Sequence, residues 1–282
     1  MMVIHMAKKV EYKKYNNILF ENRAGVARVT LNRPDVRNAI NEDLIIETCN
    51  LFQTIKDDDS VRVVVLTGAG SAFCAGADLN WMKKVVDYDI EENVMDAEHL
   101  VDMLEFIDTC PKPVIGRING PTMGGGCGLV AVCDIAIASF DAKFAFSEVK
   151  LGIVPAIISP YVIRKIGIGP TRELFLTGER FDAHKAKEIG LVNSVAQPEA
   201  LDSSINAKID LLLASGPKAM AEVKKLVRKV PYVVPTDLRK YTSELIAKLR
   251  VSDEGQEGIS AFLNKRDASW AIKDKNKGKE EK

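Results

Sequence analysis

Short apolar runs rich in β-branched residues alternate with longer segments of helical spacing along the first half of the chain. The runs are typical of buried strands and span residues 26–31, 61–67, 113–118, 134–139 and 143–146. Between them, residues 42–56 and 93–108 repeat apolar positions every three or four residues, the period of an amphipathic helix. The first stripe is Leu44, Ile45, Thr48, Leu51, Phe52 and Ile55, and the second is Val94, Ala97, Val101, Leu104 and Ile107. Strands alternating with helices predict an α/β architecture.

The pattern changes after Pro155, where strand-like runs nearly vanish. Helical segments follow at residues 161–166, 170–176, 183–189, 201–214, 217–229 and 236–250. The sequence therefore predicts a mixed α/β body over residues 1–200 and a mostly helical C-terminal region over residues 201–282. Neither an internal repeat nor a low-complexity linker marks the boundary.

Composition and charge exclude several classes of protein. The 282 residues are 46% hydrophobic and 28% charged, unlike a disordered chain or a disulfide framework. Lys+Arg and Asp+Glu both number 39, whereas proteins that bind nucleic acid usually carry a basic excess. No apolar run approaches the roughly 20 residues that span a bilayer, so we expect a cytoplasmic protein without a membrane partner. The five cysteines form no C-x-x-C pair and the three histidines no H-E-x-x-H motif, so we expect free buried thiols and no metal site.

Two corners rich in glycine and alanine follow predicted strands. The first, "LTGAGSAFCAGADLNWM", is a weak nucleotide signal because Phe73 stands where a dinucleotide fingerprint needs its third glycine. The second, "INGPTMGGGCGLVAV", leads into an apolar stretch that fits a buried helix. N–H groups at a helix start are free donors in a partly positive field, which suits a developing oxyanion. A tight packing turn between helix and strand is the alternative for the second corner, but one N–H from each corner could converge on a thioester carbonyl.

Glu148 lies between a short apolar strand and Gly152. A carboxylate in apolar surroundings has a raised pKa and can exchange protons near neutral pH, although a solvated loop position is the alternative. His99, beside Glu98 on the second helix, is expected to be a partly exposed helix residue rather than a border of a substrate pocket. The basic stretch at residues 218–240 fits a solvated helix face or a patch facing an anionic ligand or another subunit.

The corners and the glutamate, in this order, resemble the crotonase (enoyl-CoA hydratase/isomerase) family. The matching segments are residues 25–40, 72–82, 118–139, 144–155, 176–195 and 257–267. The resemblance implies a crotonase-type spiral of ββα repeats with a mostly helical C-terminal trimerisation region, assembled as a trimer or a dimer of trimers. It also implies an acyl-CoA thioester substrate. No cofactor is implied, since coenzyme A enters as part of the substrate.

The resemblance also assigns site residues. Glu148 is the acid/base, and the backbone N–H groups of Ala77 and Gly125 are the oxyanion donors. The predicted substrate and coenzyme A contacts are Arg37, Ala75, Ala77, Asp78, Leu79, Asn80, Gly124 and Gly125, with Lys265 and Arg266 reaching coenzyme A from a neighbouring subunit.

Gly128 departs from the pattern of hydratases that carry two glutamates, the first of which would stand there. We expect an enoyl-CoA hydratase with one glutamate; the alternatives are a Δ3,Δ2-enoyl-CoA isomerase, whose proton shuttle needs a single base, and a non-catalytic coenzyme A-binding protein. Segments such as "AGADLNWM" and "SEVKLGIVPAIISPYV" resemble branched-chain hydratases that act on 3-methylglutaconyl-CoA or γ-carboxygeranoyl-CoA. A distal substrate carboxylate would need Arg117, Lys150 or Asn80 as its partner.

Overall fold

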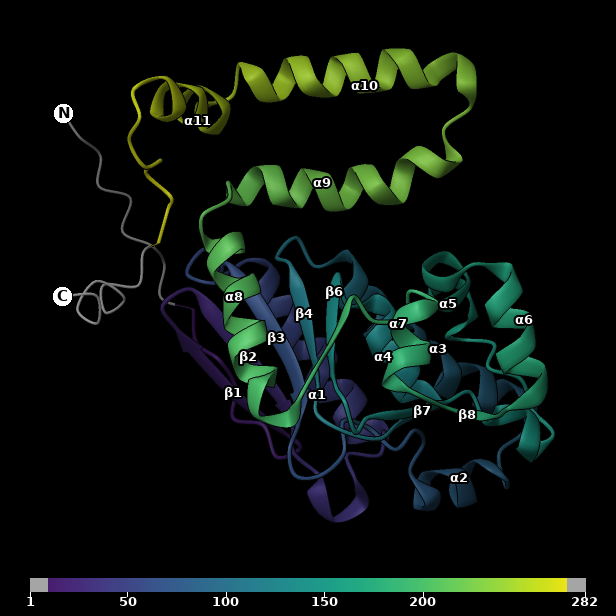
Figure 1. Ribbon diagram of the computed structural model, residues 1–282. Helices are drawn as coiled ribbons and strands as arrows, with labels where there is room; N and C mark the ends of the chain where they lie inside the picture. Colours follow the sequence, from purple (N-terminus) through teal and green to yellow (C-terminus); the bar gives the residue numbers. More distant parts are fainter. Residues whose placement is uncertain (1–9, 273–282) are drawn as a thin grey trace.

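Two sheets form the body of the computed structural model, which describes residues 10–272 (Figure 1). The six-stranded sheet has the order β1-β2-β3-β4-β6-β9, and the three-stranded sheet has the order β5-β7-β8. The strands are β1 (Ile18–Arg23), β2 (Val26–Leu31), β3 (Val63–Gly68), β4 (Val114–Ile118), β5 (Thr122–Met123), β6 (Ile135–Ser139), β7 (Lys143–Ala145), β8 (Arg180–Asp182) and β9 (Ser194–Ala196). The pairs β1–β2 and β7–β8 are antiparallel, and the other pairs are parallel.

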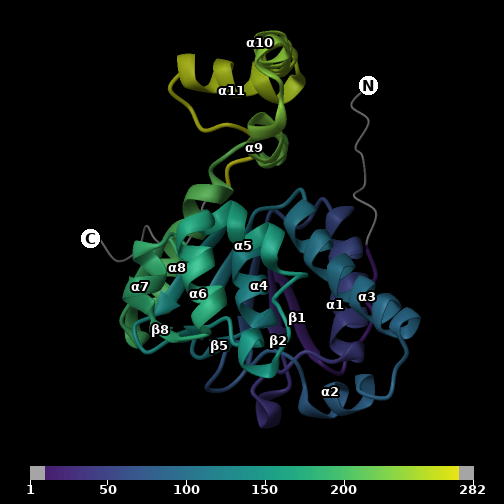
Figure 2. The ribbon, with the colours of Figure 1, turned by 90° about the vertical axis from the view of Figure 1, so that its right-hand side faces the viewer.

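Helices cover both faces of the larger sheet. The helices of the described chain are α1 (Glu42–Lys56), α2 (Leu79–Val85), α3 (Ile90–Thr109), α4 (Gly125–Val132), α5 (Ser159–Ile166), α6 (Ile168–Thr177), α7 (Ala183–Glu188), α8 (Leu201–Leu213), α9 (Pro217–Lys229), α10 (Pro235–Arg250) and α11 (Asp253–Leu263). Helices α1 and α3 lie on one side of the sheet and α8 on the other (Figures 1 and 2). Successive side chains of β3 point to opposite faces of the sheet. Val64 and Leu66 belong to the larger core, whereas Val63 and Val65 pack with α8.

The predicted stripe of α1 is confirmed, since all six of its residues are buried. The stripe of α3 is only partly right. Leu104 and Ile107 are buried, but Val94 is 52% exposed and Val101 is also exposed. The N-terminal end of helix α3 extends beyond the core. Apolar residues with helical spacing there have no core surface to pack against.

The five predicted strands all exist, with ends shifted by at most two residues. The pattern missed β1, β5, β8 and β9. Strand β1 lies at the edge of its sheet and buries only Ile18, so it carries almost no apolar alternation. The other three span two or three residues each, which is too short for any period to show.

Helix α8 begins at residue 201, the expected boundary, but it packs against the sheet and is therefore part of the body. Its buried residues Leu201, Ile205, Ile209 and Leu213 lie against the sheet. Helices α9, α10 and α11 extend beyond one end of that body (Figures 1 and 2). Val227, Phe262 and Leu263 on these helices are exposed large apolar side chains. The trimer or dimer of trimers stays a prediction.

Candidate active site

Glu148 opens a single 3-10 turn, Glu148–Leu151, shortly after β7. Its Oε1 atom lies 3.2 Å from the position that a Cβ would take at Gly124, so the carboxylate packs against the second glycine-rich corner. Its Oε2 atom is buried and has no hydrogen-bond partner among residues 10–272. Burial raises the pKa of Glu148 above its ordinary value because desolvation penalises the charged form. The carboxylate is therefore placed to accept and return a proton.

The two glycine-rich corners lie directly against each other. The N–H of Met123 donates to the carbonyl of Cys74 over 2.9 Å, and the N–H of Gly124 donates to Ala145 of β7 over 2.9 Å. A Cβ at Gly76 would stand 3.0 Å from the Met123 carbonyl oxygen, so a side chain there would crowd the second corner. Gly76 and Gly124 also have φ values of +90° and +49°, which favour glycine. These contacts bring both corners to the strand that leads to Glu148.

The backbone N–H groups of Ala77 and Gly125 have no hydrogen-bond acceptor among the described residues. Ala77 is fixed on both sides, since Ile40 donates to the carbonyl of Gly76 over 2.7 Å and accepts from the N–H of Asp78 over 2.8 Å. Gly125 is the first residue of α4, where an N–H has no partner within the helix. Two preorganised, unpaired donors are what an oxyanion hole requires.

A cavity of about 210 Å³ joins these donors to Glu148. It is lined by Ile40, Ala77, Trp81, Leu100, Gly125, Glu148, Ile153, Val154, Pro155, Ala156, Ile157 and Ile158. Among the described residues of this lining, Glu148 is the only charged one. Sequence reasoning missed Trp81 and Leu100. Trp81 belongs to the first glycine-rich segment, "LTGAGSAFCAGADLNWM", but was not assigned to the site. Leu100 directly follows His99, and His99 is exposed, as expected.

Gly128 lies in α4 behind this cavity, where its environment is closed. A Cβ at this position would overlap Cγ2 of Ile158, and would lie 3.1 Å from Cβ of Ile158 and 3.7 Å from Cδ1 of Leu104. The volume that a glutamate would need here is therefore filled by Ile158, which is 3% exposed.

Asp78 is occupied by interactions within the protein. Its carboxylate forms an ion pair with Arg33 over 2.8 Å and accepts from the N–H groups of Asn80 and Trp81 at the start of α2. Burial opposes ionisation of Asp78, but the N–H donors and the guanidinium outweigh burial and hold its pKa below the ordinary value. Asp78 therefore fixes the start of α2, while Leu79 and Asn80 are exposed there and line neither this cavity nor the groove described next.

A cationic groove with a volume of about 690 Å³ also borders the two corners. It is lined by Arg37, Ala75, Pro121, Met123, Lys143, Arg180, Phe181, Asp182 and Lys185. The structure thus brings the predicted contacts Arg37 and Ala75 together, and the N–H of Ala75 donates to the Arg37 carbonyl over 2.9 Å. Lys143, Arg180 and Lys185 were missed, because they come from β7, β8 and α7 and share no sequence motif with Arg37.

The buried side chain of Asn38 fixes the loop that carries Arg37. Its Oδ1 accepts from the N–H of Arg33 over 2.9 Å, and its Nδ2 donates to the carbonyls of Ala69 and Ala72 over 2.9 Å each. Asn38 has a φ of +57°, a conformation that asparagine tolerates better than most residues. The loop after β2 is therefore tied to the loop after β3.

Other expected contacts lie outside both the cavity and the groove of the described chain. Arg266 pairs with Glu257 over 2.7 Å beside the exposed Lys265, at the end of α11. Arg117 makes a bidentate pair with Asp202 of α8, and Lys150 is exposed. The approach of Lys265 and Arg266 from a neighbouring subunit stays a prediction.

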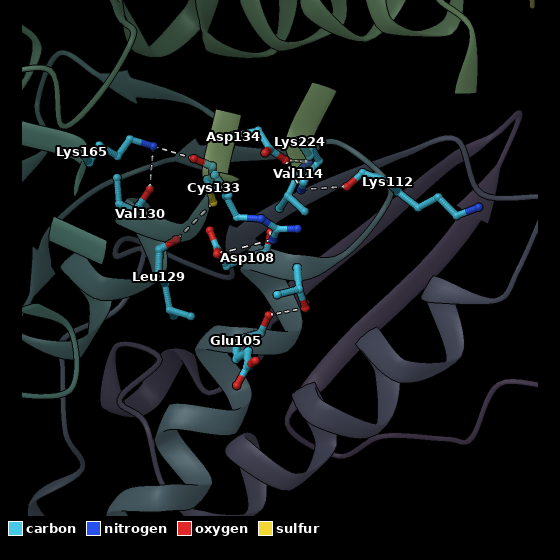
Figure 3. Close-up of polar contacts among 12 residues, drawn as sticks. Glu105, Asp108, Lys112, Val114, Leu129, Val130, Cys133, Asp134, Lys165 and Lys224 are labelled. Carbon is cyan, nitrogen blue, oxygen red and sulfur yellow. Dashed lines mark hydrogen bonds and ion pairs between the residues drawn. The ribbon is translucent and has the colours of Figure 1, made fainter. Parts of the chain in front are cut away.

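Lys165 holds the far end of α4. Figure 3 shows its Nζ directed at the carbonyl oxygens of Val130 and Cys133, to both of which it donates a hydrogen bond. Burial lowers the pKa of Lys165. Nearby, Asp134 accepts from the N–H of Val114 and pairs with Lys224, which fastens α9 to the body (Figure 3). Helix α4 is thus anchored at the end opposite to Gly125.

Residues 10–272 contain neither a cluster of three His, Cys, Asp or Glu side chains suited to a metal ion nor a helix that could span a membrane. The five cysteines are free, and all but Cys49 are buried. Burial raises the pKa of Cys49 to about 11 and that of Cys133 to about 12, so both thiols stay protonated at neutral pH.

Known proteins match almost the whole chain. The model of the enoyl-CoA hydratase/isomerase family matches residues 21–273. A short-chain-enoyl-CoA hydratase of Clostridium acetobutylicum is 33% identical over 254 residues, covering 89% of this chain and 96% of that protein. A crotonyl-CoA hydratase of Syntrophomonas wolfei is 32% identical over 264 residues, covering 92% of this chain and 99% of that protein.

The fold agrees with this relationship. The crystal structure of an enoyl-CoA hydratase from Shewanella pealeana superposes with a TM-score of 0.88 at 40% identity, covering 91% of this chain and 97% of that one. The expected crotonase-type fold is therefore confirmed. The chain belongs to the enoyl-CoA hydratase/isomerase (crotonase) family and is an enzyme of the enoyl-CoA hydratase type.

Proposed function

We propose that this enzyme adds water across the 2,3 double bond of a short, branched 2-enoyl-CoA thioester, with Glu148 as its single acid and base. One observation supports this above all others. A buried carboxylate oxygen without a partner belongs to a residue that lines the same apolar cavity as two residues with unpaired backbone N–H groups.

The N–H groups of Ala77 and Gly125 would donate to the thioester oxygen. They favour the enolate that forms during addition over the neutral carbonyl, and this difference is what lowers the barrier. Glu148, in its ionised form, would take a proton from water as the oxygen bonds to C3. The protonated carboxyl would then deliver that proton to C2 as the enolate collapses, which restores the carboxylate.

The cavity favours a small and uncharged acyl group. Its volume of about 210 Å³ lies below the roughly 300–1,000 Å³ of complete ligand sites. A 3-methylglutaconyl group, with its distal carboxylate, is the substrate expected from the resemblance. Because the described lining offers no cation and Arg117 is paired elsewhere, we favour a branched acyl group without that charge.

The coenzyme A phosphates would lie in the cationic groove. Arg37, Lys143, Arg180 and Lys185 place four positive charges there against one carboxylate, Asp182. The groove shares the two glycine-rich corners with the cavity, since Ala75 and Met123 directly precede Gly76 and Gly124. A thioester between the corners could therefore have its nucleotide end in the groove.

A Δ3,Δ2-isomerase is the second candidate, favoured by the single carboxylate, since a proton shuttle needs no water. Crotonyl-CoA, 3-methylglutaconyl-CoA, 3-methylcrotonyl-CoA and 3-hexenoyl-CoA should be incubated with the enzyme in water labelled with heavy oxygen. Label gained at C3, found by mass spectrometry, supports the hydratase. A shifted double bond without label makes the enzyme an isomerase and overturns the proposal.

A further inference from the structure

The contact between Gly128 and Ile158 joins two segments on either side of Glu148 in the sequence. Gly128 is in the middle of α4, and Ile158 directly precedes α5. The carbonyl of Ile158 accepts from the N–H of Val162 over 3.0 Å and from the N–H of Tyr161 over 3.2 Å. The first turn of α5 therefore holds the backbone of Ile158 and with it the Cβ atom, which lies 3.1 Å from the position of a Cβ at residue 128.

Ile158 faces two environments. On one side it fills the space next to Gly128, where even one added methyl group would overlap its Cγ2. On the other side it lines the acyl cavity together with Glu148. Its volume thus closes the cavity toward α4 and excludes any side chain at position 128.

We propose that Ile158 is a specificity-determining residue that acts as a pair with Gly128. The isoleucine side chain fills the space that a second carboxylate would need, and it forms an apolar wall of the cavity. An acyl group with a methyl branch packs on this wall, while longer or bulkier acyl groups meet it and are rejected. Its effect on the choice of substrate rests on the proposed hydration, whereas the steric pairing of the two residues does not.

A double-mutant cycle on stability tests the pairing. Gly128→Ala should lower the urea midpoint of unfolding strongly in the wild-type background. In the Ile158→Ala background the same change should have little effect, because the truncated side chain leaves room for the added methyl group. Ile157→Ala is the matched control, since Ile157 also lines the cavity but makes no close contact with position 128. Additive effects in the Ile158 cycle would overturn the pairing.

Substrate profiles test the specificity. Ile158→Ala should raise kcat/KM for acyl groups one or two carbons longer, relative to the best wild-type substrate, by about 10- to 200-fold per carbon accommodated. Ile158→Val should give a smaller shift in the same direction. An unchanged profile in an Ile158→Ala protein that still turns over its best substrate would refute the inference.

The two proposals fail in different ways. If the wild-type enzyme hydrates no thioester but isomerises one, hydration is wrong, and the stability cycle still decides the pairing. If the enzyme hydrates its substrate but neither the cycle nor the profile responds at Ile158, hydration stands and the role of Ile158 is wrong.

Discussion

Replacing Glu148 by glutamine tests the centre of the proposed chemistry. The amide keeps the shape of the side chain but cannot accept a proton from water. A positioned acid or base contributes typically about 10²- to 10⁴-fold to a rate. No second carboxylate lines the described cavity, and Asp78 is paired with Arg33. With no group to take over, we expect kcat to fall near the upper end of that range.

Binding should survive this change, because the amide leaves the unpaired N–H groups and the apolar lining in place. Calorimetric titration with the hydrated product should give a Kd within a few-fold of the wild-type value. A loss of turnover smaller than tenfold would refute Glu148 as the base. Lost affinity with retained kcat would assign it to substrate binding instead.

The raised pKa of Glu148 gives the same variant a pH signature. The folded state holds this proton more tightly than the unfolded state, in which the pKa is about 4.3. As pH rises from that value through the folded-state pKa, the native protein loses stability from this group, and Glu148→Gln removes the loss. Urea unfolding should therefore favour the variant over wild type increasingly from acid to neutral pH. The acid limb of kcat should lie above the ordinary carboxyl pKa, and a pH-independent stability gap would contradict the desolvation argument.

Three further substitutions test the surroundings of the site. Asn38→Ala should cost about 3 kcal/mol by urea unfolding, at about 1 kcal/mol for each of its three hydrogen bonds; an effect below 1 kcal/mol would mean that the loop holds without them. Arg33→Met should cost about 3–5 kcal/mol, because it leaves the buried Asp78 carboxylate unpaired, and equal stability at neutral pH would show that the N–H donors suffice. Lys143→Ala should raise KM for the acyl-CoA several-fold at low salt but not KM for the matching acyl-pantetheine, which lacks the nucleotide phosphates. An equal rise for both thioesters would remove the phosphates from the groove.

The spacing of apolar residues along the chain predicts structural features that involve only one face of one helix or strand. The stripe of α1 is right in every residue because the whole helix lies over the core. Val94 has the same spacing in α3 and is exposed, because spacing alone cannot show where the underlying sheet ends. Both glycine-rich corners and Glu148 could be singled out from the residues, since each follows a strand and is dense in small or charged residues.

The walls of the site could not be predicted in this way. Trp81, Leu100 and Ile158 come from separate helices and loops, and each is an ordinary apolar residue in its own segment. The cationic groove likewise gathers Lys143, Arg180 and Lys185 from separate elements of the smaller sheet and its following helix. Such residues become neighbours only through strand pairing, which leaves no local pattern.

Three glycines shape the proposed site through different contacts. At Gly76 and Gly124 the missing side chains let two loops approach until their donors and Glu148 line one cavity. At Gly128 the missing side chain leaves room for Ile158. An alanine at Gly124 would press on Glu148 Oε1 and disturb catalysis directly, whereas an alanine at Gly128 would act through the isoleucine wall. In the proposed mechanism, the first two glycines therefore build the reaction centre, and the third acts on the choice of acyl group through Ile158.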